Sequence, residues 1–140
     1  SPEKNTDAHT FLKHAPEGFP WQPWSPEAVA QARAAGKPVI VNFTAKWCLT
    51  CNLTVKPALG KEAVTRKLGE LRAVALVADY TEYPPEITKE LARFERAGVP
   101  LVLVYPRDAT KPPMVLPEPL SFSAASYSET ILEALVAAGK

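Results

Sequence analysis

Sulfur is scarce in this chain of 140 residues, which contains two cysteines and one methionine. Two cysteines form one intramolecular disulfide at most, so the chain is not one of the small secreted domains that several disulfides hold together. Its length is sufficient to bury a core without such bridges. Because 46% of the residues are hydrophobic, the composition is that of a globular domain rather than a disordered segment.

An excess of charge is also absent, since 16 Lys and Arg residues face 15 Asp and Glu residues and the net charge is +1. The charges are interspersed, and the lack of a basic block argues against nucleic-acid binding. No apolar run approaches the roughly 18 residues of a membrane span. The first residue is Ser1 rather than Met. We interpret the chain as an excised domain or a processed form, with any signal or membrane anchor outside it.

The pattern of apolar residues divides the chain into an arm and one domain. Residues 1–20 are polar and contain proline without a sustained period, so we predict an N-terminal arm or linker, followed by a domain at 21–140. The predicted strands are 19–24, 39–43, 73–78, 101–105 and 113–116. The predicted helices are 25–36, 48–58, 61–68, 85–97 and a last helix that begins near residue 126.

Local signals set the predicted helix boundaries. Ser25 and Pro26 are a typical N-cap and first helical residue, and Gly98 is the expected stop of helix 85–97. Ser126 and Glu129 form a capping-box pattern for the last helix, while Pro57 should weaken or kink helix 48–58. Strands that alternate with helices predict an α/β fold, with a central mixed sheet and helices on both faces.

The two cysteines lie together in the stretch KPVIVNFTAKWCLTCNLTVK, as Cys48 and Cys51. A structural disulfide closing so short a loop would stabilise the fold only weakly. A zinc site needs about four ligands, and the remaining candidates, His9 and His14, lie in the predicted arm. A redox pair is favoured, because a cysteine at a helix N-terminus after a buried strand ionises readily, and the second cysteine can resolve a mixed disulfide.

A proline at the start of a predicted strand supports the redox interpretation. Pro100 follows Gly98 and Val99 and directly precedes strand 101–105. Proline cannot donate a hydrogen bond to a strand ladder, which makes this a marked position. We hypothesise that the Val99–Pro100 peptide bond is cis; an ordinary trans proline is the alternative.

These motifs carry a family resemblance. FTAKWCLTC, followed at a distance by GVP and a strand, resembles the thioredoxin superfamily. KPVIVNFTAKWCLTC together with VADYTEYPPEITKELARFERAGVPLVLVYP is similar to the C-terminal periplasmic thioredoxin-like domain of DsbD-type thiol:disulfide interchange proteins. The resemblance covers roughly residues 24–138. It implies a thioredoxin-like fold and electron transfer from a membrane domain to periplasmic thiol proteins, including isomerases and cytochrome maturation factors.

The resemblance also implies roles for individual residues. Cys48 would be the nucleophile and Cys51 the resolving thiol. From the residues themselves we expect no dissociable cofactor, because the two cysteines carry the electrons, and no metal, because one C-x-x-C supplies only two ligands. The supporting and partner-contacting residues would be Trp47 beside the exposed sulfur, Pro100 as the cis proline, and Val99 and Leu49 against a docked partner.

Three positions depart from the family pattern. Asn42 stands where thioredoxins usually carry a buried Asp, and Lys46 and Val55 stand where DsbD relatives often carry acids. Replacing acids near a thiolate lowers its pKa, so we predict a more acidic Cys48 than in acid-bearing relatives and a more oxidising domain. Asn42 has the alternative of a buried amide hydrogen-bonded within the core. Asp79 and Glu82 are candidate replacement proton carriers, with loop capping or plain solvation as the alternative for both.

Together these observations predict a monomeric thiol:disulfide oxidoreductase domain in the bacterial periplasm, tethered to the inner membrane in the full-length protein. Its partners would be a membrane DsbD-type domain and periplasmic thiol proteins, without nucleic acid. Two alternatives remain. One is a stand-alone thioredoxin-like reductase or an oxidant. The other is a non-enzymatic docking module or a Cu(I)-binding module, since thiolates are soft ligands.

Overall fold

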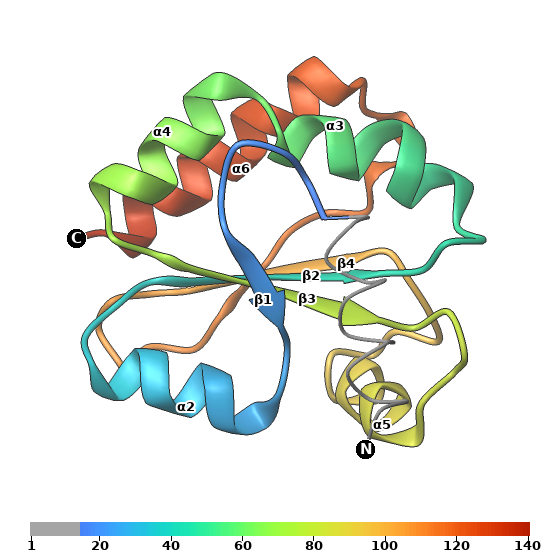
Figure 1. Cartoon of the computed structure of the whole chain (residues 1–140), viewed down its shortest axis with the longest axis horizontal. Helices are drawn as coiled ribbons and strands as arrows, with labels where there is room; N and C mark the ends of the chain where they lie inside the picture. Colours follow the sequence, from blue (N-terminus) through green and yellow to red (C-terminus); the bar gives the residue numbers. More distant parts are fainter. Residues whose placement is uncertain (1–14) are drawn as a thin grey trace.

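A five-stranded mixed sheet forms the centre of the protein, as the computed structural model of residues 15–140 shows (Figure 1). The predicted arm lies mostly outside these residues, as do His9 and His14, and the boundary at residue 20 stays a prediction. The strands are β1 (Trp21–Pro23), β2 (Val39–Thr44), β3 (Val74–Asp79), β4 (Leu101–Tyr105) and β5 (Met114–Val115).

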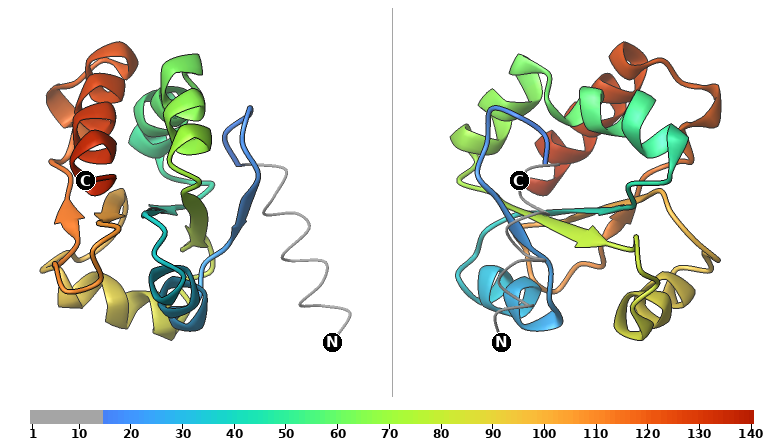
Figure 2. Two further views of the ribbon diagram at one scale, coloured as in Figure 1. Left: turned by 90° about the vertical axis from the view of Figure 1, so that its left-hand side faces the viewer. Right: turned by 45° about the vertical axis from the view of Figure 1, so that its right-hand side comes forward.

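The strand order β1-β3-β2-β4-β5 places β1 and β5 at the two edges (Figure 2). The pairs β1–β3 and β2–β3 are parallel, whereas β2–β4 and β4–β5 are antiparallel. The short edge strand β1 tolerates Pro23 because its outer side needs no donor. Trp21 and Trp24 hold this edge in place: Trp21 is buried in the core, and the Trp24 ring packs on Phe43 at 5.7 Å. The prediction of a mixed α/β sheet is confirmed.

Helices cover both faces of the sheet. The helical elements are α2 (Pro26–Ala34), η1 (Cys51–Val55), α3 (Lys56–Leu59), α4 (Glu62–Glu70), α5 (Pro85–Arg93), η2 (Pro119–Ser121) and α6 (Ala124–Ala138). In Figure 1, α3, α4 and α6 lie above the sheet, and α2 and α5 lie below it. Alternate residues of each central strand face one of two apolar clusters. None of the described helices combines the length and the apolar character that crossing a membrane requires.

The capping prediction for α2 is confirmed. The Ser25 hydroxyl accepts a hydrogen bond from the Ala28 N–H at 3.0 Å, and Pro26 occupies the first turn. Gly36 follows the helix with a φ of 71°, a conformation that glycine adopts without strain. Ser25 and Pro26 therefore begin this helix as the sequence predicted, and Gly36 follows its end.

The capping box predicted for the last helix was wrong, although the helix begins close to the predicted start near residue 126. Helix α6 begins at Ala124, and its capping box is formed by Ser123 and Ser126 rather than by Ser126 and Glu129. Each serine hydroxyl accepts the backbone N–H of the other, at 3.0 and 2.9 Å. Phe122 packs edge-on against Tyr127 at 5.5 Å, which is the hydrophobic staple of this helix start.

The predicted end of helix 85–97 was also wrong, because α5 ends at Arg93. Glu95 adopts a left-handed φ of 58°. The Glu95 and Arg96 N–H groups then bond back to the Ala92 and Leu91 carbonyls, both at 3.0 Å, in a Schellman motif. The segment from residue 94 to Gly98 is therefore a loop that leads to the Val99–Pro100 bond.

The helix that carries the cysteines is irregular, but not at Pro57 itself. Its first turn is α-helical, residues 51–55 form the π-helical segment η1, and regular α3 follows. The Lys56 N–H bonds to the Cys51 carbonyl, five residues back. A proline cannot donate to the carbonyl four residues before it and crowds that carbonyl, and a wider turn just upstream relieves both problems.

Candidate active site

Cys48 and Cys51 form a disulfide at the end of β2, where the chain turns into the helix. Their Cα atoms are 5.3 Å apart, within the usual range for a disulfide. Cys48 is 7% exposed and Cys51 is 1% exposed, so Cys48 is the sulfur nearer to solvent. The backbone N–H of Cys51 points at the Cys48 Sγ atom at 3.2 Å. This helix N-terminus favours an anionic sulfur at Cys48.

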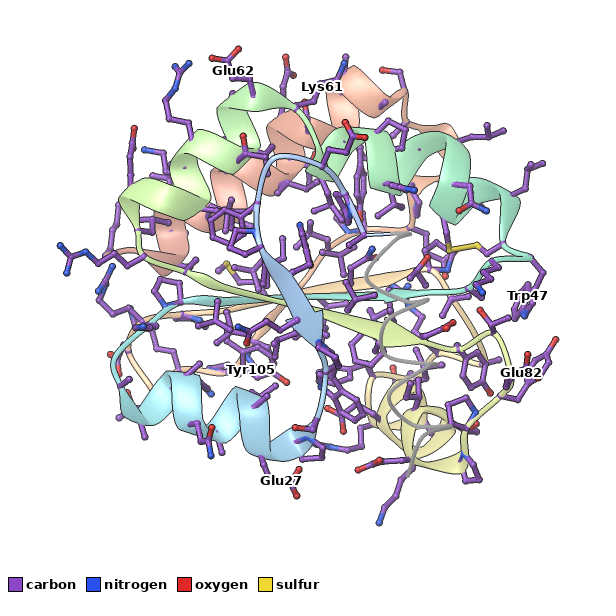
Figure 3. The ribbon with its side chains drawn as sticks, in the orientation of Figure 1. Glu27, Trp47, Lys61, Glu62, Glu82 and Tyr105 are labelled. Carbon is purple, nitrogen blue, oxygen red and sulfur yellow. A yellow bond between two sulfur atoms is a disulfide. The ribbon has the colours of Figure 1, made fainter. Side chains whose placement is uncertain are left out.

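Trp47 lies beside the disulfide and is half exposed, at the same end of the molecule (Figure 3). Its indole Nε1–H donates to the Thr81 carbonyl at 3.0 Å, and its ring stacks on Tyr83 with 5.4 Å between centroids. The Lys46 N–H donates to the Thr81 hydroxyl at 3.0 Å. The loop after β3 therefore holds the residues that precede Cys48.

Asp79, the last residue of β3, fixes that loop in turn. Its Oδ1 atom accepts a hydrogen bond from the Thr81 N–H at 2.8 Å and a second from the Thr81 hydroxyl. The sequence drew attention to TEYPPEIT only as a family motif. It gave no signal that Thr81 and Tyr83 contact Trp47, because these contacts join segments 34 or more residues apart.

The Val99–Pro100 peptide bond is cis, which confirms the hypothesis drawn from the sequence. Both residues line a surface groove of about 450 Å³ that also includes Cys48. Trp47 and Leu49 line the groove next to Cys48, and the loop after α5 and the segment 118–120 after β5 form its other walls. Leu49 is 71% exposed. The structure thus brings together five of the predicted site residues around one groove: Trp47, Cys48, Leu49, Val99 and Pro100.

Arg96 connects two walls of this groove, and the sequence analysis did not identify it. Its Nη1–H donates to the Pro100 carbonyl at 3.1 Å, and its Nη2–H donates to the Leu116 carbonyl at 3.4 Å. Nη1 also lies 3.7 Å from the Glu118 carboxylate. Arg96 therefore ties the cis-proline loop to the segment after β5.

Asn42 and Lys46 lie outside this groove and line a second pocket. Asn42 is 3% exposed, yet its Oδ1 atom has no hydrogen-bond partner among the described residues. The alternative of an amide fully hydrogen-bonded within the core does not hold for this oxygen. Both residues line a pocket of about 270 Å³ between β2, β3 and the helix. Val55 is buried in the core, where a carboxylate would be costly.

Metal ligands do not gather in the part of the chain that the structure describes. Within residues 15–140, no three His, Cys, Asp or Glu side chains come close enough to hold a metal ion. A disulfide that opens to a dithiol carries two electrons.

Comparison with known proteins identifies relatives of this arrangement. A family model described as thioredoxin-like matches residues 20–106. The thiol:disulfide interchange protein DsbD 1 of Pseudomonas aeruginosa is 33% identical over 78 residues, which are 56% of this chain and 13% of that protein. DsbD of Vibrio cholerae is 33% identical over 75 residues, or 54% of this chain and 12% of that protein. The chain therefore matches a small part of each relative.

Solved structures show the same fold. A thioredoxin from Thermus thermophilus superposes with a TM-score of 0.61 at 25% identity, covering 85% of this chain and 88% of that one. The reduced C-terminal domain of DsbD from Neisseria meningitidis gives a TM-score of 0.58 at 21% identity, covering 79% and 96%. A C-x-x-C disulfide in this fold, with relatives named for thiol:disulfide interchange, supports thiol–disulfide exchange as the general chemistry.

Proposed function

Since this chain belongs to the thioredoxin-like family, we propose that it is a thiol:disulfide oxidoreductase domain that relays electrons between partner proteins through Cys48 and Cys51. The observation that carries the proposal is the place of the disulfide. The less buried sulfur, Cys48, lies at a helix N-terminus and lines a groove with the cis Val99–Pro100 segment. A partner polypeptide in that groove would meet the sulfur that is better suited to attack.

The reaction begins from the dithiol. The Cys48 thiolate attacks a partner disulfide, forms a mixed disulfide and releases one partner thiolate. Cys51 then loses its proton and attacks the Cys48 Sγ atom. The mixed disulfide breaks, the second partner thiolate leaves, and the Cys48–Cys51 disulfide is restored. Two electrons pass to the partner, and its two thiolates take up two protons.

Exposed apolar side chains around Cys48 suit a transient protein partner. Trp47, Leu49 and Leu120 line the groove and are 49%, 71% and 76% exposed. Val99 lines the same groove. Apolar surface of this kind, rimmed by polar residues, is typical of an interaction site. In this proposal Trp47, Leu49 and Val99 contact the partner, and Pro100 shapes the groove.

For the partners and the compartment, the support comes from the relatives rather than from the site. We infer a DsbD-type role, in which a membrane domain supplies electrons and periplasmic thiol proteins receive them. Cytochrome maturation factors are candidate recipients. The domain would then act in the bacterial periplasm, close to the inner membrane.

The reduction potential of the pair tests this function. The protein is equilibrated with a series of glutathione ratios, and the thiol state is read by alkylation and mass spectrometry. We expect a reversible two-electron disulfide with a potential between about −270 and −200 mV, the range of reductants and relays. A potential near about −120 mV would replace the relay with an oxidant.

Two variants complete the test. Cys51→Ser should trap a mixed disulfide between Cys48 and a peptide disulfide, because the resolving sulfur is missing. Cys48→Ser should trap none, although its groove is otherwise intact. If the wild-type protein forms no reversible disulfide, or if Cys48→Ser traps as well as Cys51→Ser, the proposed function is wrong.

A further inference from the structure

The pocket that Asn42 lines raises the question of where the Cys51 proton goes. A thiol must ionise before it attacks a disulfide, and Cys51 is 1% exposed, so bulk water has little access to it. Asn42 lines the pocket and cannot accept the proton as a carboxylate would. Asn42 is 3% exposed, and its buried Oδ1 atom has no hydrogen-bond partner among the described residues. Such an acceptor calls for a donor that occupies the pocket, and water is the simplest one.

The pocket has the size and the polarity to hold water. Its volume is about 270 Å³, and a water molecule in the liquid occupies about 30 Å³. Thr44 from β2 and Asn52 from the helix add polar groups to its lining. Asn52 directly follows Cys51 in the chain. Ala45, which also lines the pocket, belongs to the same buried cluster as Cys51, and this cluster connects the pocket to the resolving cysteine.

Among the residues that the structure describes, one carboxylate lines this pocket, and it belongs to Asp79. Strand register explains its place. Asn42 pairs with Val77 and Thr44 pairs with Asp79 across the parallel strands β2 and β3. Residues two apart on a strand share a face, so Asp79 lies on the face that carries Asn42, on the neighbouring strand and two residues nearer the active-site end. Both hydrogen bonds from Thr81 go to Oδ1, which leaves Oδ2 for water.

We propose that Asp79 is the proton acceptor for Cys51, acting through water in this pocket. When the mixed disulfide has formed at Cys48, the Cys51 thiol gives its proton through that water to the Asp79 carboxylate. The Cys51 thiolate attacks the Cys48 Sγ atom, and the partner leaves as a thiolate. Asp79 then returns its proton to solvent. In the reverse direction, protonated Asp79 supplies the proton to Cys51.

The other charged groups of the pocket are Lys46 and Lys56. Their ammonium groups favour the ionised form of a neighbouring sulfur but do not accept a proton. Glu82 lies on the loop that follows Asp79, outside the pocket lining and near Trp47 at the surface (Figure 3). It therefore provides a matched carboxylate for comparison.

The inference rests on the proposed function only in its use of the Cys48–Cys51 pair, and its test needs no protein partner. The reduced protein is mixed with an aromatic disulfide, dithiobisnitrobenzoate, in a stopped-flow instrument between pH 5 and 8. Attack by Cys48 releases the first coloured thiolate at a rate proportional to the reagent concentration. Attack by Cys51 on the mixed disulfide releases the second at a rate independent of that concentration. Cys51→Ser, which gives the first phase alone, identifies the two phases.

We expect Asp79→Asn to slow the second phase by about 100-fold at neutral pH, the usual loss when a general base is removed. The rate should then rise tenfold with each pH unit, as direct reaction with hydroxide requires. The first phase should change by less than about threefold, which also shows that the site is folded. Glu82→Gln should keep both phases. Asn42→Asp in the Asp79→Asn background should restore the second phase at least tenfold, because it returns a carboxylate to the pocket.

Three results would overturn the assignment. The first is an unchanged second phase in Asp79→Asn. The second is an equal loss in Thr81→Val, which keeps the carboxylate and removes the hydroxyl bonded to it, because the role would then be to hold the loop. The third is the same loss in Lys56→Met with none in Asp79→Asn, which would assign the effect to the ammonium group. A protein with no first phase at all would instead contradict the proposed function.

Discussion

Replacing Arg96 by Met should destabilise the oxidised protein by about 2 to 3 kcal/mol. The methionine keeps most of the aliphatic stem and removes the guanidinium group. The hydrogen bond to the Pro100 carbonyl is 3.1 Å long and comes from a side chain that is 17% exposed, so its loss should cost about 1.5 kcal/mol. The longer bond to the Leu116 carbonyl, 3.4 Å, should add about 0.5 to 1 kcal/mol.

The ion pair with Glu118 contributes little to this sum. Its atoms are 3.7 Å apart and the Glu118 side chain is 58% exposed, so we assign it less than about 0.5 kcal/mol. With a urea m-value of about 2 kcal/mol/M, the midpoint of unfolding should fall by about 1 to 1.5 M. The urea midpoint of Arg96→Lys should lie between those of the wild type and Arg96→Met, because an ammonium group cannot bond to two carbonyls at once as the planar guanidinium group does.

Arg66→Met is the matched control for this experiment. Arg66 pairs with Glu62 on the surface of α4, and the two side chains are 64% and 84% exposed. Such a pair contributes about 0.5 kcal/mol or less. If Arg96→Met shifts the urea midpoint no more than Arg66→Met does, water satisfies the two carbonyls as well as the guanidinium group does, and no stability is lost. The idea that Arg96 holds the groove together would then fail.

Three further predictions concern other parts of the molecule. Burial raises the pKa of Tyr127 to about 12 from 10.0; the unfolded chain loses this proton first, so stability should fall by up to about 2.5 kcal/mol between pH 10 and 12. Measured by urea titration, the free energy of unfolding of Tyr127→Phe should fall less between pH 10 and 12 than that of the wild type. An equal fall in both proteins would contradict this. Leu49→Ser and Leu120→Ser should each lower kcat/KM for protein disulfides about three- to tenfold without changing the urea midpoint; unchanged kinetics would remove these residues from the docking surface. Ser123→Ala should cost about 1 kcal/mol as a lost N-cap, and exposed Ser121→Ala should cost almost nothing; equal midpoints for the two would argue against the cap.

The sheet and its helices were predictable because short-range patterns carry them. β-branched runs such as Val39–Phe43 identify buried strands, and Ser25 with Pro26 identifies a helix start. The errors lie where the local signals are ambiguous or misleading. Ser126 belongs to two capping patterns, and the packing of Phe122 on Tyr127 selects the earlier one. A glutamate in the left-handed conformation at residue 95 ends α5, although glutamate at such a position gives no signal in a sequence.

The cysteine pair and the cis proline were predictable for the same reason, because residues adjacent to them in the sequence form recognisable motifs. The residues around them were not. Trp47 meets the loop after β3 across more than 30 residues, and Arg96 reaches the Leu116 carbonyl across 20. The position of the pocket acid depends on strand register, because a shift of one residue between β2 and β3 would turn Asp79 to the opposite face. The sequence therefore indicated that a carboxylate was missing at Asn42. It also named Asp79 and Glu82 as candidate replacements without choosing between them, and the pairing of Thr44 with Asp79 shows that Asp79 lies on the same face of the sheet as Asn42.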